Sequence, residues 1–159
     1  MEMNDKPFCN LWLDAGIFSS HLGFESAISM YNLTLTHSLA AESSPIFLSG
    51  AKLTYEPNER RTLAGIITNG WQRLQQVKGN SIPSFGTQVS HSGSKKTTIN
   101  WSTLVGTDDP HETRRIRYFN NVYEQFQLSE KIAVIADYDI DTQQKIKNSS
   151  TFDFWLTLL

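Results

Sequence analysis

Apolar and polar residues alternate along most of this chain in segments of about ten residues. A period of two places successive side chains on opposite faces of an extended strand. In one segment, for example, Ile99 and Trp101 alternate with Asn100. The clearest segments are 46–56, 99–105 and 132–140, and weaker ones occur at 8–18, 61–71, 85–92, 117–128 and 151–158. The pattern therefore predicts eight strands, several of them near the ~9–11 residues that cross a bilayer at a tilt.

The predicted connections are alternately short and long from residue 46 onward. The short ones are 57–60, 93–96 and 129–131, and the longer polar ones are 72–84, 108–116 and 143–150. This order is typical of a membrane β-barrel, which has tight turns at one end and loops at the other. Segment 19–45 fits neither class. We expect it to fold over or into a pore, with a possible amphipathic helix around 25–31.

The alternation also predicts which side chains face outward from such a barrel. The expected outer positions are Ile99, Trp101, Val105, Val134, Ala136, Tyr138 and Ile140, and the expected inner positions are Asn100, Ser102, Asp137, Asp139 and Asp141. A slip of one residue would exchange the two faces of a strand. On segment 117–128 Glu124 would face lipid, and a bulge is expected to re-aim it. Four aromatic residues lie near predicted strand ends, each expected either at the headgroup level or as an ordinary core residue: Phe18, Tyr55, Trp71 and Tyr118.

Composition supports an uncharged, water-facing wall. The net charge is −2 and charged residues make up 19% of the chain, so no nucleic-acid partner is expected. Ser, Thr, Asn and Gln supply 49 of the 159 positions. No stretch approaches the ~18–20 apolar residues of a membrane helix. Neither an export signal at the start nor a terminal aromatic residue at the end is recognisable, so we expect a partial barrel.

Several ordered pieces of the sequence resemble one family. They are DAGIFSSHLGFESA at 14–27, AESSP at 41–45, SG at 49–50, NGWQR at 69–73 and RYF at 117–119. This run resembles the β-barrel porins called OmpL-like, found in the outer membranes of Bacteroidetes-type bacteria. The resemblance covers about residues 11–155. It implies an all-β, antiparallel transmembrane barrel with porin-like transport, and neither catalysis nor a cofactor.

The resulting hypothesis is a single partial barrel domain over 1–159, an antiparallel meander of about eight strands with the pore-associated segment 19–45. Its function would be passive diffusion of small hydrophilic solutes across the outer membrane of a Gram-negative bacterium. Outer-membrane lipid and those solutes are the expected partners. The alternative is a soluble β-sandwich or lipocalin-like module that binds a sugar or lipid. These two differ in facing, because a sandwich buries its apolar faces whereas a barrel exposes them to lipid.

Candidate pore residues are charged side chains on predicted inner faces or long loops. Asp137, Asp139 and Asp141 recur every second residue, so they point to one face about 7 Å apart and would favour cations. The other candidates are Glu25, Glu42, Arg73, Arg115 and Arg117. The histidines, among them His21, lack metal-ligand spacing and are expected to be plain surface or lumen residues. No nucleophile elbow or phosphate-binding glycine loop is present, so no catalytic residue is proposed.

Overall fold

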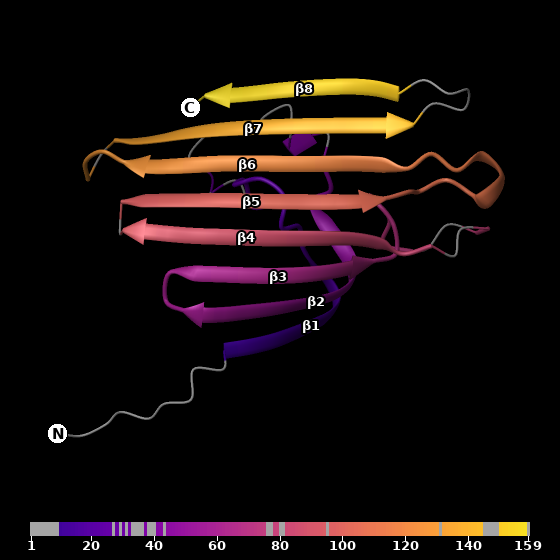
Figure 1. The fold of residues 1–159 in the computed structure, drawn as a ribbon, viewed down its shortest axis with the longest axis horizontal. Coiled ribbons are helices and arrows are strands. Elements are labelled where there is room, and N and C mark those ends of the chain that lie inside the picture. Colours follow the sequence, from indigo (N-terminus) through magenta and orange to yellow (C-terminus); the bar gives the residue numbers. More distant parts are fainter. Residues whose placement is uncertain are drawn as a thin grey trace.

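The computed structural model of the chain is one antiparallel β-sheet (Figure 1). It describes residues 10–26, 28, 30, 32, 37, 41–42, 44–75, 78–79, 82–94, 96–130, 132–144 and 150–158. The strands are β1 (Asn10–Ser19), β2 (Phe47–Asn58), β3 (Arg61–Thr68), β4 (Ser84–Ser94), β5 (Thr97–Gly106), β6 (Arg117–Gln127), β7 (Ala133–Gln144) and β8 (Ser150–Leu158). A short 3-10 helix, η2 (His111–Thr113), lies between β5 and β6. Among the described residues, no helix is long and apolar enough to cross a bilayer.

The strands follow one another across the sheet in sequence order, each antiparallel to its neighbour. This confirms the predicted all-β antiparallel meander and its eight segments, although β3 ends at Thr68 rather than at residue 71. β1 and β8 are the edges, and no pairing joins them within the described part of the chain, so the sheet is open. The architecture is therefore that of a barrel wall without its closing seam.

The short and long connections lie at opposite ends of the sheet, as predicted (Figure 1). β2 and β3 are joined by the two-residue turn Glu59–Arg60, and β6 and β7 by residues 128–132. The connections 20–46, 69–83 and 107–116 lie at the other end. Most of the predicted loop 143–150 lies outside the described residues.

The two faces of the sheet have the polarity of a barrel wall. On the outer face Trp101 is 49% exposed and Tyr138 is 36% exposed. On the inner face Asn100 and Ser102 are fully buried, and Asp139 is 1% exposed. The facing predicted from the alternation is confirmed for every strand to which it was assigned. Apolar side chains thus face the surroundings, while amides, hydroxyls and carboxylates are covered.

The inner face divides into an apolar and a polar zone. The apolar cluster lies toward the long-loop end and consists of Leu22, Leu48, Ala64, Ile66, Trp71, Leu104 and Phe119. Nearer the middle of the sheet, the strand register places Ser102, Asn121 and Asp139 in one row across β5, β6 and β7. The core of this protein is therefore built partly from polar groups, which need hydrogen-bond partners to be buried without a large cost.

The four strand-end aromatics divide between the two interpretations that the sequence left open. Trp71 is 2% exposed within the apolar cluster and Phe18 packs against that cluster, so neither ring lies on the outer face, whereas Tyr55 and Tyr118 do. The sequence could not distinguish these cases, because a ring at a strand end can turn toward either side.

The predicted bulge near Glu124 is absent, since β6 pairs with both neighbours in unbroken register. Glu124 therefore keeps its outward position, three residues from the short-turn end of β6 rather than at mid-strand. Of the possible helix around 25–31, Glu25, Ser26 and Ile28 are not helical, Met30 has 3-10 geometry, and residues 27, 29 and 31 lie outside the described part.

Candidate functional site

The three aspartates of β7 share the inner face but have different partners. Asp141 is paired with Arg117 of β6, whose Nε donates to both carboxylate oxygens at 2.9 Å. Asp137 and Asp139 instead accept hydrogen bonds from one amide, Nδ2 of Asn121, at 2.6 and 2.8 Å. The predicted carboxylate ladder is therefore one neutralised residue and one pair of aspartates that share a donor.

A chain of amides and hydroxyls continues from Asn121 across the sheet. Asn121 Oδ1 accepts from the hydroxyl of Ser102 at 3.2 Å and from the backbone N–H of Gly23 at 3.2 Å. Asn100 donates to Ser102 at 3.4 Å, and Gln88 donates to Asn100 at 3.0 Å. These contacts fix the orientation of the Asn121 amide, because its oxygen is occupied by donors while its nitrogen faces the two aspartates.

The described residues that follow β1 cover this polar zone. His21 is 5% exposed, and its Nε2 donates to the backbone carbonyl of Thr103 at 2.8 Å. Its ring lies directly over Gly86, where an added Cβ would come within 2.8 Å of two ring atoms, so only glycine permits this approach. Beyond His21, Gly23 has a φ of 73° and reaches Asn121, and Phe24 meets Tyr123 edge-on at 6.0 Å between ring centroids. The segment is thus anchored to β4, β5 and β6.

Burial keeps the His21 side chain neutral. Loss of solvation on burial lowers the pKa of His21 from 6.5 to about 4, and the positive charge of Lys52 lowers it further, although the hydrogen bond to Thr103 opposes this. Between these two pH values the unfolded chain binds a proton that the folded chain does not. The contribution of neutral His21 to the free energy of unfolding is therefore fully present above pH 6.5, the pKa in the unfolded chain. It is lost as the pH falls from 6.5 toward 4.

We accordingly predict that acidification weakens the attachment of this segment. From pH 7 to pH 4, the free energy of unfolding of the wild-type protein should fall by on the order of 3 kcal/mol more than that of His21→Gln. Urea unfolding at several pH values, followed by tryptophan emission, measures this difference. His91→Gln serves as the control because His91 is exposed, and it should keep the wild-type pH dependence. Identical pH profiles for wild type and His21→Gln would contradict the prediction.

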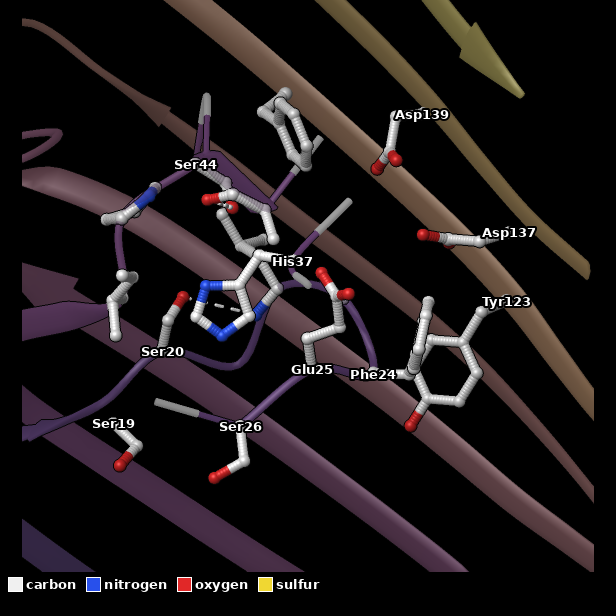
Figure 2. Close-up of a pocket in the computed structure, with 16 residues that line it drawn as sticks. Ser19, Ser20, Phe24, Glu25, Ser26, His37, Ser44, Tyr123, Asp137 and Asp139 are labelled. Carbon is white, nitrogen blue, oxygen red and sulfur yellow. Dashed lines mark hydrogen bonds between the residues drawn. The ribbon is translucent and has the colours of Figure 1, made fainter. Parts of the chain in front are cut away.

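A cavity of about 300 Å³ remains between this segment and the inner face of β6 and β7 (Figure 2). Its lining includes Glu25 and Phe24 from the segment, Tyr123 from β6, and Asp137 and Asp139 from β7. Asp137 and Asp139 thus line the same cavity as Glu25, another predicted pore residue, although more than a hundred residues separate them from it in sequence. Among the described residues, no three His, Cys, Asp or Glu side chains are grouped closely enough to hold a metal ion.

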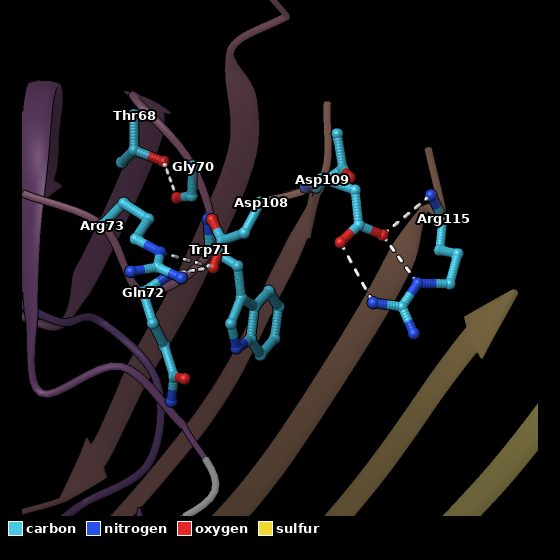
Figure 3. Close-up of polar contacts among 9 residues, drawn as sticks. Thr68, Gly70, Trp71, Gln72, Arg73, Asp108, Asp109 and Arg115 are labelled. Carbon is cyan, nitrogen blue, oxygen red and sulfur yellow. Dashed lines mark hydrogen bonds and ion pairs between the residues drawn. The ribbon is translucent and has the colours of Figure 1, made fainter. Parts of the chain in front are cut away.

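The other predicted residues lie outside the lining of this cavity. Glu42 has a 68% exposed side chain and lies 3.6 Å from the ring of His37. Arg73 has a 60% exposed side chain and approaches Asp108 at 3.9 Å. Arg115 of the β5–β6 loop forms a two-pronged ion pair with Asp109 at 2.6 and 3.0 Å, which lowers the pKa of Asp109 (Figure 3). These side chains stabilise loops at the long-loop end instead of converging on one constriction.

Asp108 connects two of those loops, a role that the sequence did not indicate. Its carboxylate accepts the backbone N–H groups of Trp71 at 2.6 Å and Gln72 at 3.1 Å (Figure 3). This holds the indole of Trp71 against Phe119, at 5.6 Å between ring centroids, and beneath the guanidinium of Arg117 at 4.5 Å. Of the residues that sequence reasoning missed, Asn121 had a weak signal, since the alternation places it inward; His21 and Asp108 had none.

Comparison with known protein families matches residues 2–158 to the family described as "Putative beta-barrel porin-2, OmpL-like". No curated protein and no solved structure matches the chain significantly. The match extends over nearly the whole sequence and agrees with the meander, the exposed apolar face and the polar inner face described above. Porin families are typically not enzymes, and they imply an outer membrane. The chain belongs to the OmpL-like family of β-barrel porins.

Proposed function

We propose that this chain forms part of the wall of a channel in the outer membrane of a Gram-negative bacterium, through which small hydrophilic solutes diffuse passively. The observation that carries the proposal is the polarity of the sheet, which has exposed apolar side chains outside and a polar network inside. Lipid is the medium that suits such an outer face, because exposing apolar side chains to acyl chains carries no free-energy cost. Outer-membrane lipid and small solutes are accordingly the proposed partners.

A soluble binding module has less support. A sandwich or lipocalin-like sheet in water would cover its outer side with charge, whereas this outer face carries large apolar side chains on β1 to β7. Leu13 is 70% exposed, Ile17 is 64% exposed and Ile67 is 51% exposed. A contiguous apolar surface on this scale favours aggregation in water and insertion in a bilayer.

The edges of the sheet bear on how the channel is completed. A bilayer offers no water to the unpaired backbone groups of β1 and β8, so only a closed barrel persists there. We propose that closure occurs in the membrane through these two edges. The segment after β1 would then lie within the lumen and narrow it.

Neighbouring residues of β1 allow a direct test of the two environments. Leu13 faces outward, while Asp14 faces inward with a 53% exposed side chain and an ion pair to Lys52 at 3.5 Å. Each is replaced with cysteine in a Cys9→Ser background, and the protein is folded into phospholipid vesicles. A membrane-impermeant thiol reagent should modify the cysteine at 14, while a fluorophore at 13 should be quenched by brominated lipid. Equal modification at both positions would contradict a wall with water on one side and lipid on the other.

The depth dependence of a charge on the outer face provides a second prediction. Leu53 lies near the middle of β2 and Phe47 at its end, both point outward, and both are 48% exposed. Leu53→Arg should destabilise the protein folded in vesicles by about 2–4 kcal/mol. Phe47→Arg should destabilise it by only about 0–1 kcal/mol, because Phe47 lies near the interface. Urea titrations of the protein in vesicles measure both. In a sheet exposed to water on this face, the two substitutions would have similar, small effects.

A further inference from the structure

The cavity beneath the segment that follows β1 has a pronounced negative character. Glu25, Asp137 and Asp139 contribute carboxylates, and its described lining contains neither lysine nor arginine. Its one histidine, His37, lies 3.6 Å from the carboxylate of Glu42. In Figure 2 the carboxylates of Asp137 and Asp139 point into the cavity toward Glu25. A cation that enters this space therefore meets three carboxyl groups and no basic side chain of lysine or arginine from the described lining.

A second, independent observation is that one carboxylate oxygen of Asp139 lacks a donor. Its side chain is 1% exposed, and Oδ1 accepts from Asn121 at 2.8 Å, but Oδ2 is buried with no hydrogen-bond partner. Asn121 cannot supply the second bond by turning, because its oxygen already accepts from Gly23 and Ser102. A buried carboxylate oxygen without a donor is costly, so the site is complementary to a group that brings N–H donors.

The remaining walls decide which kind of cation fits. The three carboxylates are not among groups that could surround a single metal ion. The lining also contains apolar and aromatic side chains, namely Leu22, Phe24, Phe119 and Tyr123, together with the hydroxyls of Ser20, Ser26 and Ser44. A volume of about 300 Å³ lies at the small end of the range for organic ligands. Carboxylates beside aromatic and aliphatic side chains match a cation that has a hydrocarbon body.

We propose that this cavity binds a small organic ammonium compound, such as an aliphatic amine, whose ammonium group donates to Oδ2 of Asp139 while its carbon chain lies against Phe24 and Tyr123. The site would make organic cations a preferred solute class of the channel. In that respect the inference rests on the proposed function, but occupancy of the cavity can be measured without transport.

The test uses 1,4-diaminobutane as the probe and 1,4-butanediol as its neutral counterpart, titrated calorimetrically into the folded protein in detergent at pH 7.5. The diamine should bind with one-to-one stoichiometry and the diol should not. Asp139→Asn should weaken diamine binding by roughly tenfold or more, because it removes the charge-assisted hydrogen bond. Asp14→Asn, on the same inner face but outside the cavity, should leave binding unchanged. Circular dichroism verifies that both variants are folded.

Several outcomes would overturn the assignment: no diamine binding at millimolar concentration, equal binding of diol and diamine, or unchanged binding in Asp139→Asn. Displacement of the diamine by equimolar Mg²⁺ would overturn it as well, because it would identify a metal site. The comparison of diamine with diol on the wild-type protein stands even if a variant fails to fold. Failure here with the expected labelling at positions 13 and 14 would leave the channel wall intact, whereas failure of that labelling would refute the channel itself.

Discussion

Replacing Arg117 with methionine should lower the free energy of unfolding by about 3–5 kcal/mol. The guanidinium is the ion-pair partner of Asp141, whose side chain is 7% exposed, and it also lies over the ring of Trp71 at 4.5 Å. Removing it leaves a buried carboxylate without its counter-ion, and the penalty for that charge exceeds what the pair contributes as a whole. Reversible urea unfolding in phospholipid vesicles, followed by tryptophan emission, provides the measurement.

Two further variants separate this cause from a general loss of packing. Arg117→Met combined with Asp141→Leu should recover most of the lost stability, because no charge is then left unpaired. Arg115→Met removes the other two-pronged pair, but that side chain is 38% exposed on a loop where solvent screens the charges, so the change should cost much less than Arg117→Met. A double variant as unstable as Arg117→Met alone would show that the unpaired carboxylate is not the source of the effect.

Truncation of Phe119 should be equally costly. Its ring is 1% exposed, packs edge-on against Trp71 and belongs to the apolar cluster beneath the long loops. Phe119→Ala should therefore destabilise the folded protein by about 3–5 kcal/mol, since the rigid strands on either side cannot collapse into the vacated space. The same urea titration measures it, and the apolar walls of the amine cavity should be disturbed as well, because Phe119 forms part of them.

The preceding residue of β6 is a matched control. Tyr118 is 40% exposed on the outer face, where fluid acyl chains can fill the space left by a smaller side chain. Tyr118→Ala should accordingly cost less than half as much as Phe119→Ala, because no cavity persists. If the two substitutions proved equally destabilising, the distinction between a packed inner face and a lipid-facing outer face would be untenable.

The strands were predictable because their information is local. A period of two is visible in segments such as 99–105 and 132–140. The same period fixes the face of every residue in a strand once the face of one residue is known. For this reason the outward position of Trp101 and the inward position of Asp139 both followed from the sequence. The order of short and long connections likewise followed, since neighbouring antiparallel strands must turn at alternate ends.

The contents of the inner face were less predictable, because they depend on contacts between residues far apart in sequence. For Trp71 the sequence left an aromatic girdle and the core equally open, and Asp108 holds the backbone of its loop in a turn that points the ring inward. His21 was expected to be an ordinary surface or lumen residue, yet it is buried against Gly86. Neither outcome has a local signal, because both are decided by the shape of the partner surface.

The aspartates of β7 show what a local sequence pattern determines and what only long-range contacts determine. Their spacing alone determined that all three share the inner face, because side chains two residues apart in a strand point the same way. Only the tertiary structure decided that Asp141 is neutralised by Arg117 while Asp137 and Asp139 share Asn121 and border a cavity. Facing follows from backbone geometry within one strand, whereas charge state and partners follow from register and from a segment folded back over the sheet, which only the assembled chain brings together.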